Sequence, residues 1–171
     1  RVNKLTGINP RNITCGATHC HTGIPWERDQ KDEVANDAQE GYHRVLERLA
    51  ADCVVLAYMH MEEAEIVYGK GNVEGISFCR NYYMKNGTPR TNPGIGNPDI
   101  IGPVAGVDSD FAILFARTKE GKPLGMLSSF ACHQDCVDGT AYSGDYSSEM
   151  AKVLKRTYGY DFVSVFMNGL S

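Results

Sequence analysis

The sequence predicts an α/β fold with a mixed sheet and flanking helices, and three observations carry this prediction. Apolar residues recur at three- and four-residue steps between residues 31 and 60, which is the spacing of one amphipathic helix. Two strand-like runs, 111–117 and 124–131, flank a polar turn with a Gly and predict an antiparallel hairpin. A helix over 146–158 and a strand over 161–166 follow. Helices that alternate with strands, together with one hairpin, are typical of a mixed sheet.

The start of the chain predicts a helix end, a strand and a loop. The opening residues have the character of a helix end that runs into a turn at 7–10. We expect a strand from about residue 11 that ends at His19-Cys20-His21. The polar loop over 22–33 contains the only Trp, Trp26, and predicts a pocket wall or a lid, because functional residues concentrate on loops held by rigid elements.

The middle of the chain predicts two short strands and one long loop. The runs 65–68 and 76–80 have strand-like composition. Residues 81–106 hold Asn-Gly, Thr-Pro, Asn-Pro and Gly-Pro pairs in quick succession, which predicts a loop. A loop of this length in a compact domain is functional or mobile, and a disordered insertion is the alternative.

The two long predicted helices have identifiable faces and ends. The apolar stripe of the first is formed by Tyr42, Val45, Leu46, Leu49, Cys53 and Leu56. Ser143 and Asp145 are candidate N-caps of the second helix. Gly159 stands where a left-handed C-cap is expected.

The composition is that of an ordinary globular chain of 171 residues, with 42% hydrophobic and 22% charged residues. The net charge of -4 predicts no general attraction to nucleic acid or to an anionic membrane. No apolar run approaches the length of a membrane span. We expect residues 1–171 to form a single partial domain, an incomplete portion of a larger one, because the chain lacks an initiator Met and ends soon after a predicted strand.

The six cysteines do not predict a small disulfide framework in a chain of this length. Cys15, Cys53, Cys79 and Cys132 lie in apolar or strand-like runs, where a free Cys behaves as a small buried hydrophobe. Cys132 and Cys136 are also a candidate metal or redox pair, although their spacing is not that of a zinc knuckle. Unpaired thiols favour a reducing compartment such as the cytoplasm.

Three histidines form the candidate site. His19 and His21 lie two residues apart, so in an extended strand both rings point to one face. His133 ends a second strand-like run, 127–133, in a similar setting. Neutral imidazole is a favoured zinc ligand, and two strands that each deliver a histidine predict a metal site at a sheet edge. The alternative is that each ring is an ordinary hydrogen-bonded histidine.

Five blocks of sequence follow one another in the order and spacing of a known family. They are Thr18-His19-Cys20-His21-Thr22-Gly23-Ile24, Gly71-Asn72-Val73-Glu74-Gly75 with Cys79-Arg80, Val107-Asp108-Ser109-Asp110-Phe111, Leu124-Gly125 with Phe130-Ala131-Cys132-His133, and Ser143-Gly144-Asp145-Tyr146. In these blocks the chain resembles the neutral/alkaline, non-lysosomal ceramidase family, specifically an internal part of its N-terminal catalytic domain.

The resemblance implies a zinc-dependent amidohydrolase that hydrolyses the amide bond of N-acylsphingosine or a related N-acyl lipid. It implies that His19 and His133 are zinc ligands and that His21 and Arg80 line the pocket and handle the polar group of the substrate. A zinc ion would polarise the amide carbonyl, His21 would move a proton, and Arg80 would stabilise an oxyanion or carboxylate. Family members are commonly secreted or membrane-facing, whereas the free thiols favour the cytoplasm.

The sequence departs from the family pattern beside the pocket. Ile24 and Gln134 stand where the family has Pro, and Asn81-Tyr82 replaces Ser-Pro. The Glu and Tyr zinc ligands and the serine nucleophile of the family would lie beyond Ser171, so this chain alone is expected to bind zinc weakly. The alternative function is therefore a catalytically inactive, ceramidase-like binding domain, and a thiol-based role of Cys132 and Cys136 is a third possibility.

Two aspartates are candidate acceptors for the N–H groups of the histidine rings. They are Asp145 and Asp108. Helix capping and turn formation are the alternatives, and capping is the favoured interpretation for Asp145.

Overall fold

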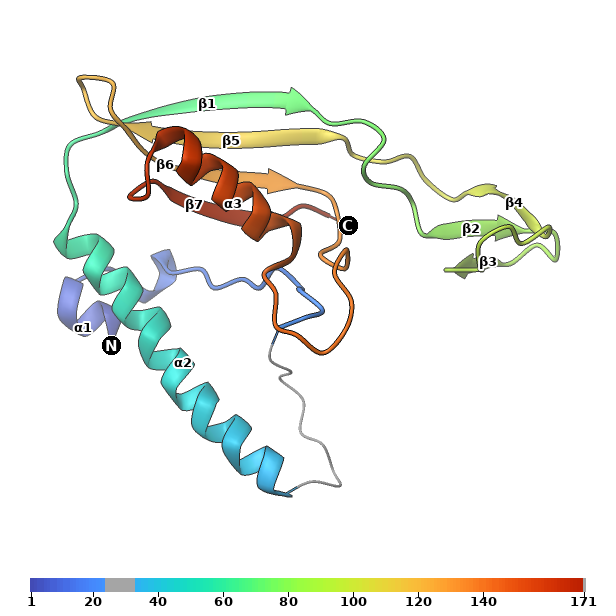
Figure 1. The fold of residues 1–171 in the computed structure, drawn as a ribbon, viewed down its shortest axis with the longest axis horizontal. Helices are drawn as coiled ribbons and strands as arrows, with labels where there is room; N and C mark the ends of the chain where they lie inside the picture. Colours follow the sequence, from blue (N-terminus) through green and yellow to red (C-terminus); the bar gives the residue numbers. More distant parts are fainter. Residues whose placement is uncertain (24–32, 171) are drawn as a thin grey trace.

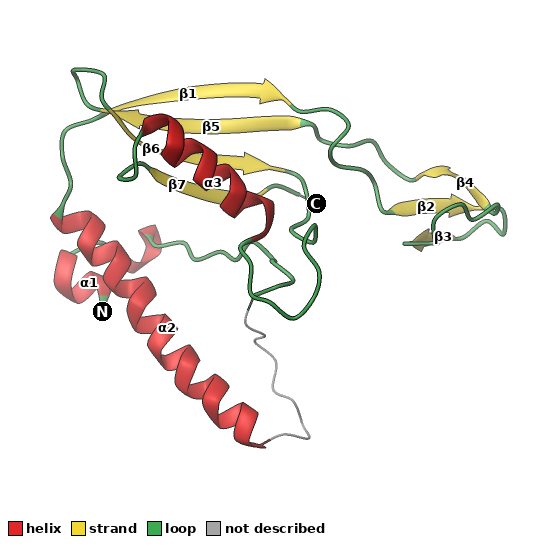
Figure 2. Ribbon diagram, in the orientation of Figure 1, coloured by secondary structure: helices red, strands yellow, loops and turns green. Residues whose placement is uncertain are grey.

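The computed structural model describes residues 1–23 and 33–170, and its centre is a four-stranded mixed sheet. The strand order is β1 (Glu65–Asn72), β5 (Asp110–Arg117), β6 (Pro123–Phe130) and β7 (Val163–Asn168). The first three strands pair antiparallel, and β6 pairs parallel with β7. The predicted α/β class with a mixed sheet is confirmed, as Figure 2 shows by its strands and helices.

The predicted hairpin is confirmed as β5 and β6. Its turn closes with hydrogen bonds from the Thr118 amide to the Lys122 carbonyl and from the Gly121 amide to the Thr118 carbonyl, both at 2.9 Å. Gly121 has a φ of 88°, a left-handed conformation that costs glycine little because it has no Cβ. The predicted strand at 65–68 is also present, and it extends to Asn72 because the whole of β1 pairs with β5.

Helix α3 (Asp145–Tyr158) makes the crossover that a parallel β6–β7 pair requires, and it covers one face of the sheet (Figure 1). Aromatic rings fill the space between the two layers. Tyr146 meets Phe166 with ring centroids 5.5 Å apart, and Tyr158 meets Phe162 at 4.8 Å and Phe115 at 5.6 Å. Phe162 is only 2% exposed, so this aromatic cluster is the hydrophobic centre of the layer.

The predicted caps of α3 were wrong. The residue before the helix is Gly144, which makes no side-chain capping bond. Asp145 is the first residue of the helix, although its φ of 52° is not helical. The Ser143 hydroxyl accepts a hydrogen bond from the Asp145 amide at 3.0 Å, which fixes the approach to the helix instead. Gly159 ends the helix with a positive φ of 108° and a ψ of 159°, which is not the left-handed helical cap that was predicted.

The sheet face opposite α3 is apolar and exposed in the described part of the chain. Alternation along the strands places Ile66, Tyr68, Leu114, Val165 and Met167 on this face, and all five are exposed. Their neighbours one residue along, such as Phe115 and Phe166, face α3.

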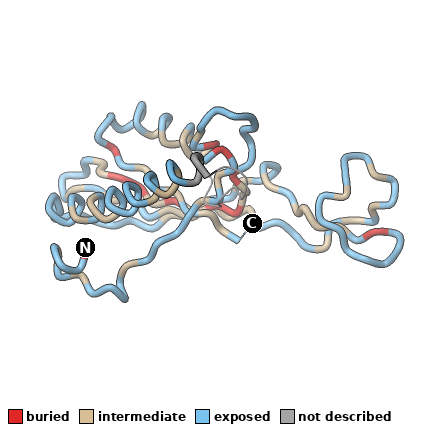
Figure 3. Tube along the Cα trace, turned by 90° about the horizontal axis from the view of Figure 1, so that it is seen from below, coloured by how far each residue is buried: buried red, intermediate tan, exposed pale blue. Residues whose placement is uncertain are grey.

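The predicted long helix is confirmed as α2 (Glu33–Met59), which contacts the short helix α1 (Val2–Thr6) at the start of the chain. An ion pair joins Arg1 to Asp52 at 2.7 Å. The 3-10 turn η1 (Pro10–Asn12) follows α1. The residues of the apolar stripe of α2 are exposed. Figure 3, coloured by burial, shows exposed and intermediate residues along the helices. No described helix combines the length and the apolar character needed to cross a membrane.

Residues 81–106, predicted to be a loop, form a second, three-stranded antiparallel sheet. Its order is β3 (Pro89–Thr91), β2 (Asn81–Met84) and β4 (Ile100–Pro103), and it extends to one side of the main sheet (Figure 1). Asn86-Gly87 makes the β2–β3 turn, in which the Asn86 side chain accepts from the Thr88 amide at 3.1 Å. The Asn-Gly pair is a hairpin signal that the many Pro residues around it obscured.

Two predicted strands are absent. Residues 76–80 are irregular, and the strand begins only at Asn81. Residues 13–21 are irregular as well, so the strand predicted to end at His19-Cys20-His21 was wrong. Trp26 and the rest of segment 24–32, predicted as a pocket wall or lid, lie outside the described residues.

Candidate metal centre

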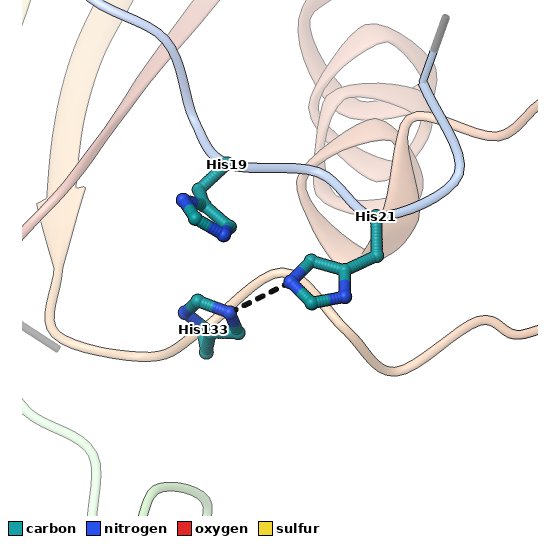
Figure 4. Close-up of side chains that lie close together, drawn as sticks. All are labelled: His19, His21 and His133. Atoms are coloured by element: carbon teal, nitrogen blue, oxygen red, sulfur yellow. Dashed lines mark hydrogen bonds between the residues drawn. The ribbon is translucent and has the colours of Figure 1, made fainter. Parts of the chain in front are cut away.

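Three imidazole rings meet beyond the carboxyl end of β6. His19, His21 and His133 each offer a nitrogen atom, and these atoms all lie within 4.8 Å of one another. The ring centroids are 5.1 Å apart for His19 and His21, 4.7 Å for His19 and His133, and 4.9 Å for His21 and His133. Figure 4 shows two rings descending from one segment and the third rising from another. The three predicted histidines are therefore brought together.

His133 is placed by the end of β6. The strand stops at Phe130, whose carbonyl accepts a hydrogen bond from the Gly169 amide at 2.9 Å, so β6 and β7 end side by side. Three residues later His133 projects beyond that edge. The carboxyl ends of parallel strands are a common position for a functional site, because the loops that leave them point the same way.

His19 and His21 are placed by hydrogen bonds to three other segments. The Asn168 side chain at the end of β7 donates to the Thr18 carbonyl at 2.7 Å, and the His21 amide donates to the Gln134 carbonyl at 3.2 Å. The Thr22 hydroxyl donates to the Ser143 carbonyl at 3.1 Å.

His19 has a φ of 55°, in the left-handed region. A turn at His19, rather than the predicted strand, therefore brings the two rings to one place.

The rings of His21 and His133 are in direct contact. Their Nε2 atoms lie 2.9 Å apart, and Nδ1 of His21 lies 3.2 Å from Oδ1 of Asp135. Burial, and then the positive charge of Arg80, lower the pKa of His133 below its ordinary value. The rings of His19 and His21 act in the same direction, and the Asp135 carboxylate opposes them. His133 therefore favours the neutral form, which is the form that binds a metal.

The donor set fits a zinc ion. Zinc takes imidazole nitrogens at about 2.0–2.1 Å in a tetrahedral arrangement, which separates two ligand nitrogens by about 3.3 Å. The Nε2 atoms of His21 and His133 lie 2.9 Å apart, and the candidate ligand nitrogens of all three rings lie within 4.8 Å of one another. These distances bracket the separation of about 3.3 Å, so small rotations of the rings would bring the nitrogens to it. Imidazole suits zinc and related transition metals far better than calcium or magnesium, which prefer oxygen ligands.

A cavity of about 460 Å³ lies beside the histidines, between the irregular segment that precedes β2 and the turn after β6. His133, Asp135 and Arg80 line it, so the predicted Arg80 does reach the site. The neighbouring lining is apolar, with exposed side chains of Ile76, Phe78, Val107 and Leu170. The cavity is therefore amphiphilic, with a cation and an imidazole among hydrophobic side chains.

The two predicted acceptors of histidine N–H groups have other partners. Asp108 accepts from the Asp110 amide at 3.0 Å, which makes a turn. Asp145 is 1% exposed, and its carboxylate accepts from the amides of Cys136, Val137 and Tyr146 at 2.9, 3.0 and 2.6 Å. The acceptor that faces the site is Asp135, which sequence reasoning missed. Its position two residues after His133 was the available signal.

The backbone contacts of Asp145 determine its protonation state. Burial alone would raise the pKa of this carboxyl group, but the backbone N–H groups of Tyr146, Val137 and Cys136 outweigh burial and leave the pKa below its ordinary value. Asp145 is therefore charged at neutral pH and shapes the turn that follows His133.

The thiols near the site are free. Burial raises the pKa of Cys132 and of Cys136, which favours the protonated thiol, the less nucleophilic form. A nucleophilic role of these thiols is therefore disfavoured. All six cysteines are unpaired, and Cys15 and Cys53 are exposed, so their predicted burial was wrong.

Comparisons with known proteins support the fold. No family model matches the chain, and no curated protein matches it. The neutral ceramidase of Pseudomonas aeruginosa is similar with 19% identity and a TM-score of 0.46, over 69% of this chain and 19% of that one. A structure of ceramidase complexed with C2 has 21% identity and a TM-score of 0.50, over 69% of this chain and 18% of that one. The chain thus spans less than a fifth of either structure, and the likeness to the second structure shows a ceramidase-like fold.

Proposed function

We propose that this chain is part of a zinc-dependent amidohydrolase that acts on the amide bond of N-acylsphingosine or a related N-acyl lipid. The observation that carries the proposal is the meeting of His19, His21 and His133 beside a cavity that also contains Arg80. The ceramidase-like fold and the resemblance in sequence support the same reaction class.

In this proposal, His19 and His133 hold the zinc ion. When bound, zinc would polarise the amide carbonyl as a Lewis acid. The guanidinium of Arg80 supplies fixed positive charge at the same cavity, where it stabilises an oxyanion or the product carboxylate through bidentate hydrogen bonds. His21, whose Nε2 faces the other rings, accepts and returns the proton of the nucleophile.

The cavity supports an amphiphilic substrate. Its volume of about 460 Å³ lies within the roughly 300–1,000 Å³ of typical ligand pockets. Ile76, Phe78 and Val107 give an apolar wall for a hydrocarbon segment, while Arg80 and His133 give a polar end for the amide. A lipid amide has both parts.

The proposal requires further groups. The resemblance implies that a Glu and a Tyr complete the zinc coordination and that a Ser is the nucleophile, each from sequence beyond Ser171. The inactive binding domain is the less favoured alternative, because a binding domain would not need three imidazoles gathered within reach of one metal ion, one of them lining the cavity.

The test is zinc content and activity in the full-length protein. We expect one tightly bound zinc per chain and hydrolysis of a fluorogenic N-acylsphingosine. A His19→Ala/His133→Ala variant should lose both, whereas a His60→Ala control should keep both, because His60 bonds to the Leu56 carbonyl at the end of α2. A protein without zinc, or with zinc but no amide hydrolysis, would contradict the proposal.

A further inference from the structure

The Asp135 carboxylate lies behind the His21 ring, on the side away from His133. Oδ1 of Asp135 is 3.2 Å from Nδ1 of His21, while Nε2 of the same ring is 2.9 Å from Nε2 of His133. Both ring nitrogens of His21 are therefore occupied, each by a different partner. Neither side chain of the His21–Asp135 pair is fully buried, with exposed fractions of 42% and 49%.

The chemistry of these partners determines where the proton of a neutral His21 lies. A carboxylate repels a lone pair and attracts an N–H group, so the 3.2 Å contact with Asp135 favours the proton of a neutral His21 at Nδ1. Nε2 then carries a lone pair, and the proton of the 2.9 Å contact belongs to Nε2 of His133. The bond at one nitrogen of a histidine thus fixes the state of the other.

We propose that Asp135 is a positioning residue that holds His21 in the Nδ1–H tautomer and so directs the Nε2 lone pair toward His133 and the metal centre. The inference deepens the proposed function and rests on it for its catalytic meaning, because only the Nε2 lone pair can accept a proton at the site. The tautomer itself requires neither metal nor substrate.

The backbone supports the same orientation. The His21 amide donates to the Gln134 carbonyl at 3.2 Å, and Gln134 lies between His133 and Asp135 in the chain. Gln134 is 0% exposed, so this short segment is packed against the interior. It therefore holds His21 twice, at the backbone through residue 134 and at the ring through residue 135.

Two other described carboxylates that could accept from a histidine ring have backbone amides as their hydrogen-bond partners instead. Asp145 accepts the three backbone amides described above, and Asp108 accepts the amide of Asp110. The Asp135 carboxylate has no equivalent backbone contact among the described residues, and its partner there is His21. Because an exposed pair of this kind contributes little to stability, its effect lies in orientation.

The experiment is nitrogen NMR of the histidine rings in the metal-free protein, at a pH high enough that the His21 signals no longer change with pH and the ring is neutral. Full-length protein is labelled with ¹⁵N in its histidines, and a His21→Gln variant assigns the signal. In the native protein we expect protonated Nδ1 and unprotonated Nε2. In Asp135→Ala, we expect most of His21 to change to the Nε2–H form that free imidazole side chains prefer.

Two further variants make the outcome decisive. Asp138→Asn is the matched control, since the partner of Asp138 among the described residues is the neighbouring Gly139 amide, and it should leave the spectrum unchanged. Asp135→Asn replaces Asp135→Ala if the latter fails to fold, and it should give a mixture, because an amide can accept or donate. A native His21 with Nε2–H, or an Nδ1–H form that survives in both Asp135 variants, would overturn the inference.

Activity separates this inference from the proposed function. If amide hydrolysis is present, Asp135→Asn should lower kcat by about ten- to a hundredfold with little change in KM, as for other carboxylates that orient a functional histidine. A protein that binds no zinc but shows the expected tautomer would refute the proposed function alone. An active enzyme whose kcat is unchanged in Asp135→Asn would refute the inference alone.

Discussion

At the scale of single residues, one buried carboxylate organises the turn that carries the metal centre. Asp145 gathers three backbone N–H groups, two of them from the turn that follows His133. Tyr146, the next residue, donates its hydroxyl to the Cys132 carbonyl at 2.6 Å, on the other side of His133. The position of His133 therefore depends on contacts made at the start of α3.

We expect Asp145→Ala to lower the free energy of unfolding by about 1–3 kcal/mol, because it leaves buried N–H groups without their acceptor. The folded-state pKa of Asp145 lies below its ordinary value, so its contribution is present above about pH 4 and is lost as the pH falls through the folded pKa. Urea denaturation at pH 7 and at pH 3 measures both effects. An equal difference between variant and native protein at the two pH values would contradict the assignment.

The residues of the site were partly predictable. Sequence spacing and resemblance identified His19, His21, His133 and Arg80, because chemical identity is visible in a sequence. Asp135 was not identified, since its role depends on a turn whose direction is determined by distant contacts such as that between the His21 amide and Gln134. The same limit explains why Asp145 was assigned as a possible acceptor of a histidine proton.

At the scale of elements, the parallel β6–β7 pair is the support of the site, and its close approach depends on one glycine. A Cβ at Gly125 would lie 2.8 Å from the Val163 carbonyl oxygen, closer than real atoms pack. The added Cβ would collide with a backbone atom of the neighbouring strand, so the two strands would have to separate to relieve the clash.

Gly125→Ala should therefore destabilise the protein by about 1–3 kcal/mol, as overpacking of a filled interior does. Gly71→Ala is the control, because a Cβ there meets nothing within 4 Å and Gly71 is also in a strand. Thermal unfolding of the two variants gives the comparison. A Gly125→Ala protein as stable as Gly71→Ala would show that the strands adjust without cost.

Elements with strong local signals were predictable, and those that depend on distant partners were not. The long helix and the β5–β6 hairpin follow from periodicity and turn chemistry, which are local. The strand expected before His19 failed because no neighbouring strand pairs with it, and the small sheet of β2, β3 and β4 was missed because its strands are short and rich in turn residues. Strand formation is a property of pairs, and a single segment does not encode its partner.

At the scale of the whole molecule, the histidines join two parts of the chain that are otherwise linked by few contacts. His19 and His21 belong to the N-terminal segment, whereas His133 belongs to the main sheet. Hydrogen bonds at Thr18, His21 and Thr22 tie that segment to the sheet and its loops. A metal ion held by His19 and His133 would add a cross-link between residues more than a hundred positions apart.

Zinc should therefore raise the stability of the whole protein. At a free zinc concentration one hundred times the dissociation constant, binding to the folded state alone adds about 2.7 kcal/mol. In an unfolding unit of about 150–250 residues that corresponds to a rise in Tm of about 5–10 °C, and in a larger unit the rise is smaller. The measurement is calorimetry of the full-length protein with zinc and with a chelator, repeated for the His19→Ala/His133→Ala variant. The variant controls for zinc bound by the six free thiols, because it keeps all of them. An equal rise in both proteins would assign the effect to the thiols and remove the histidines as the metal centre.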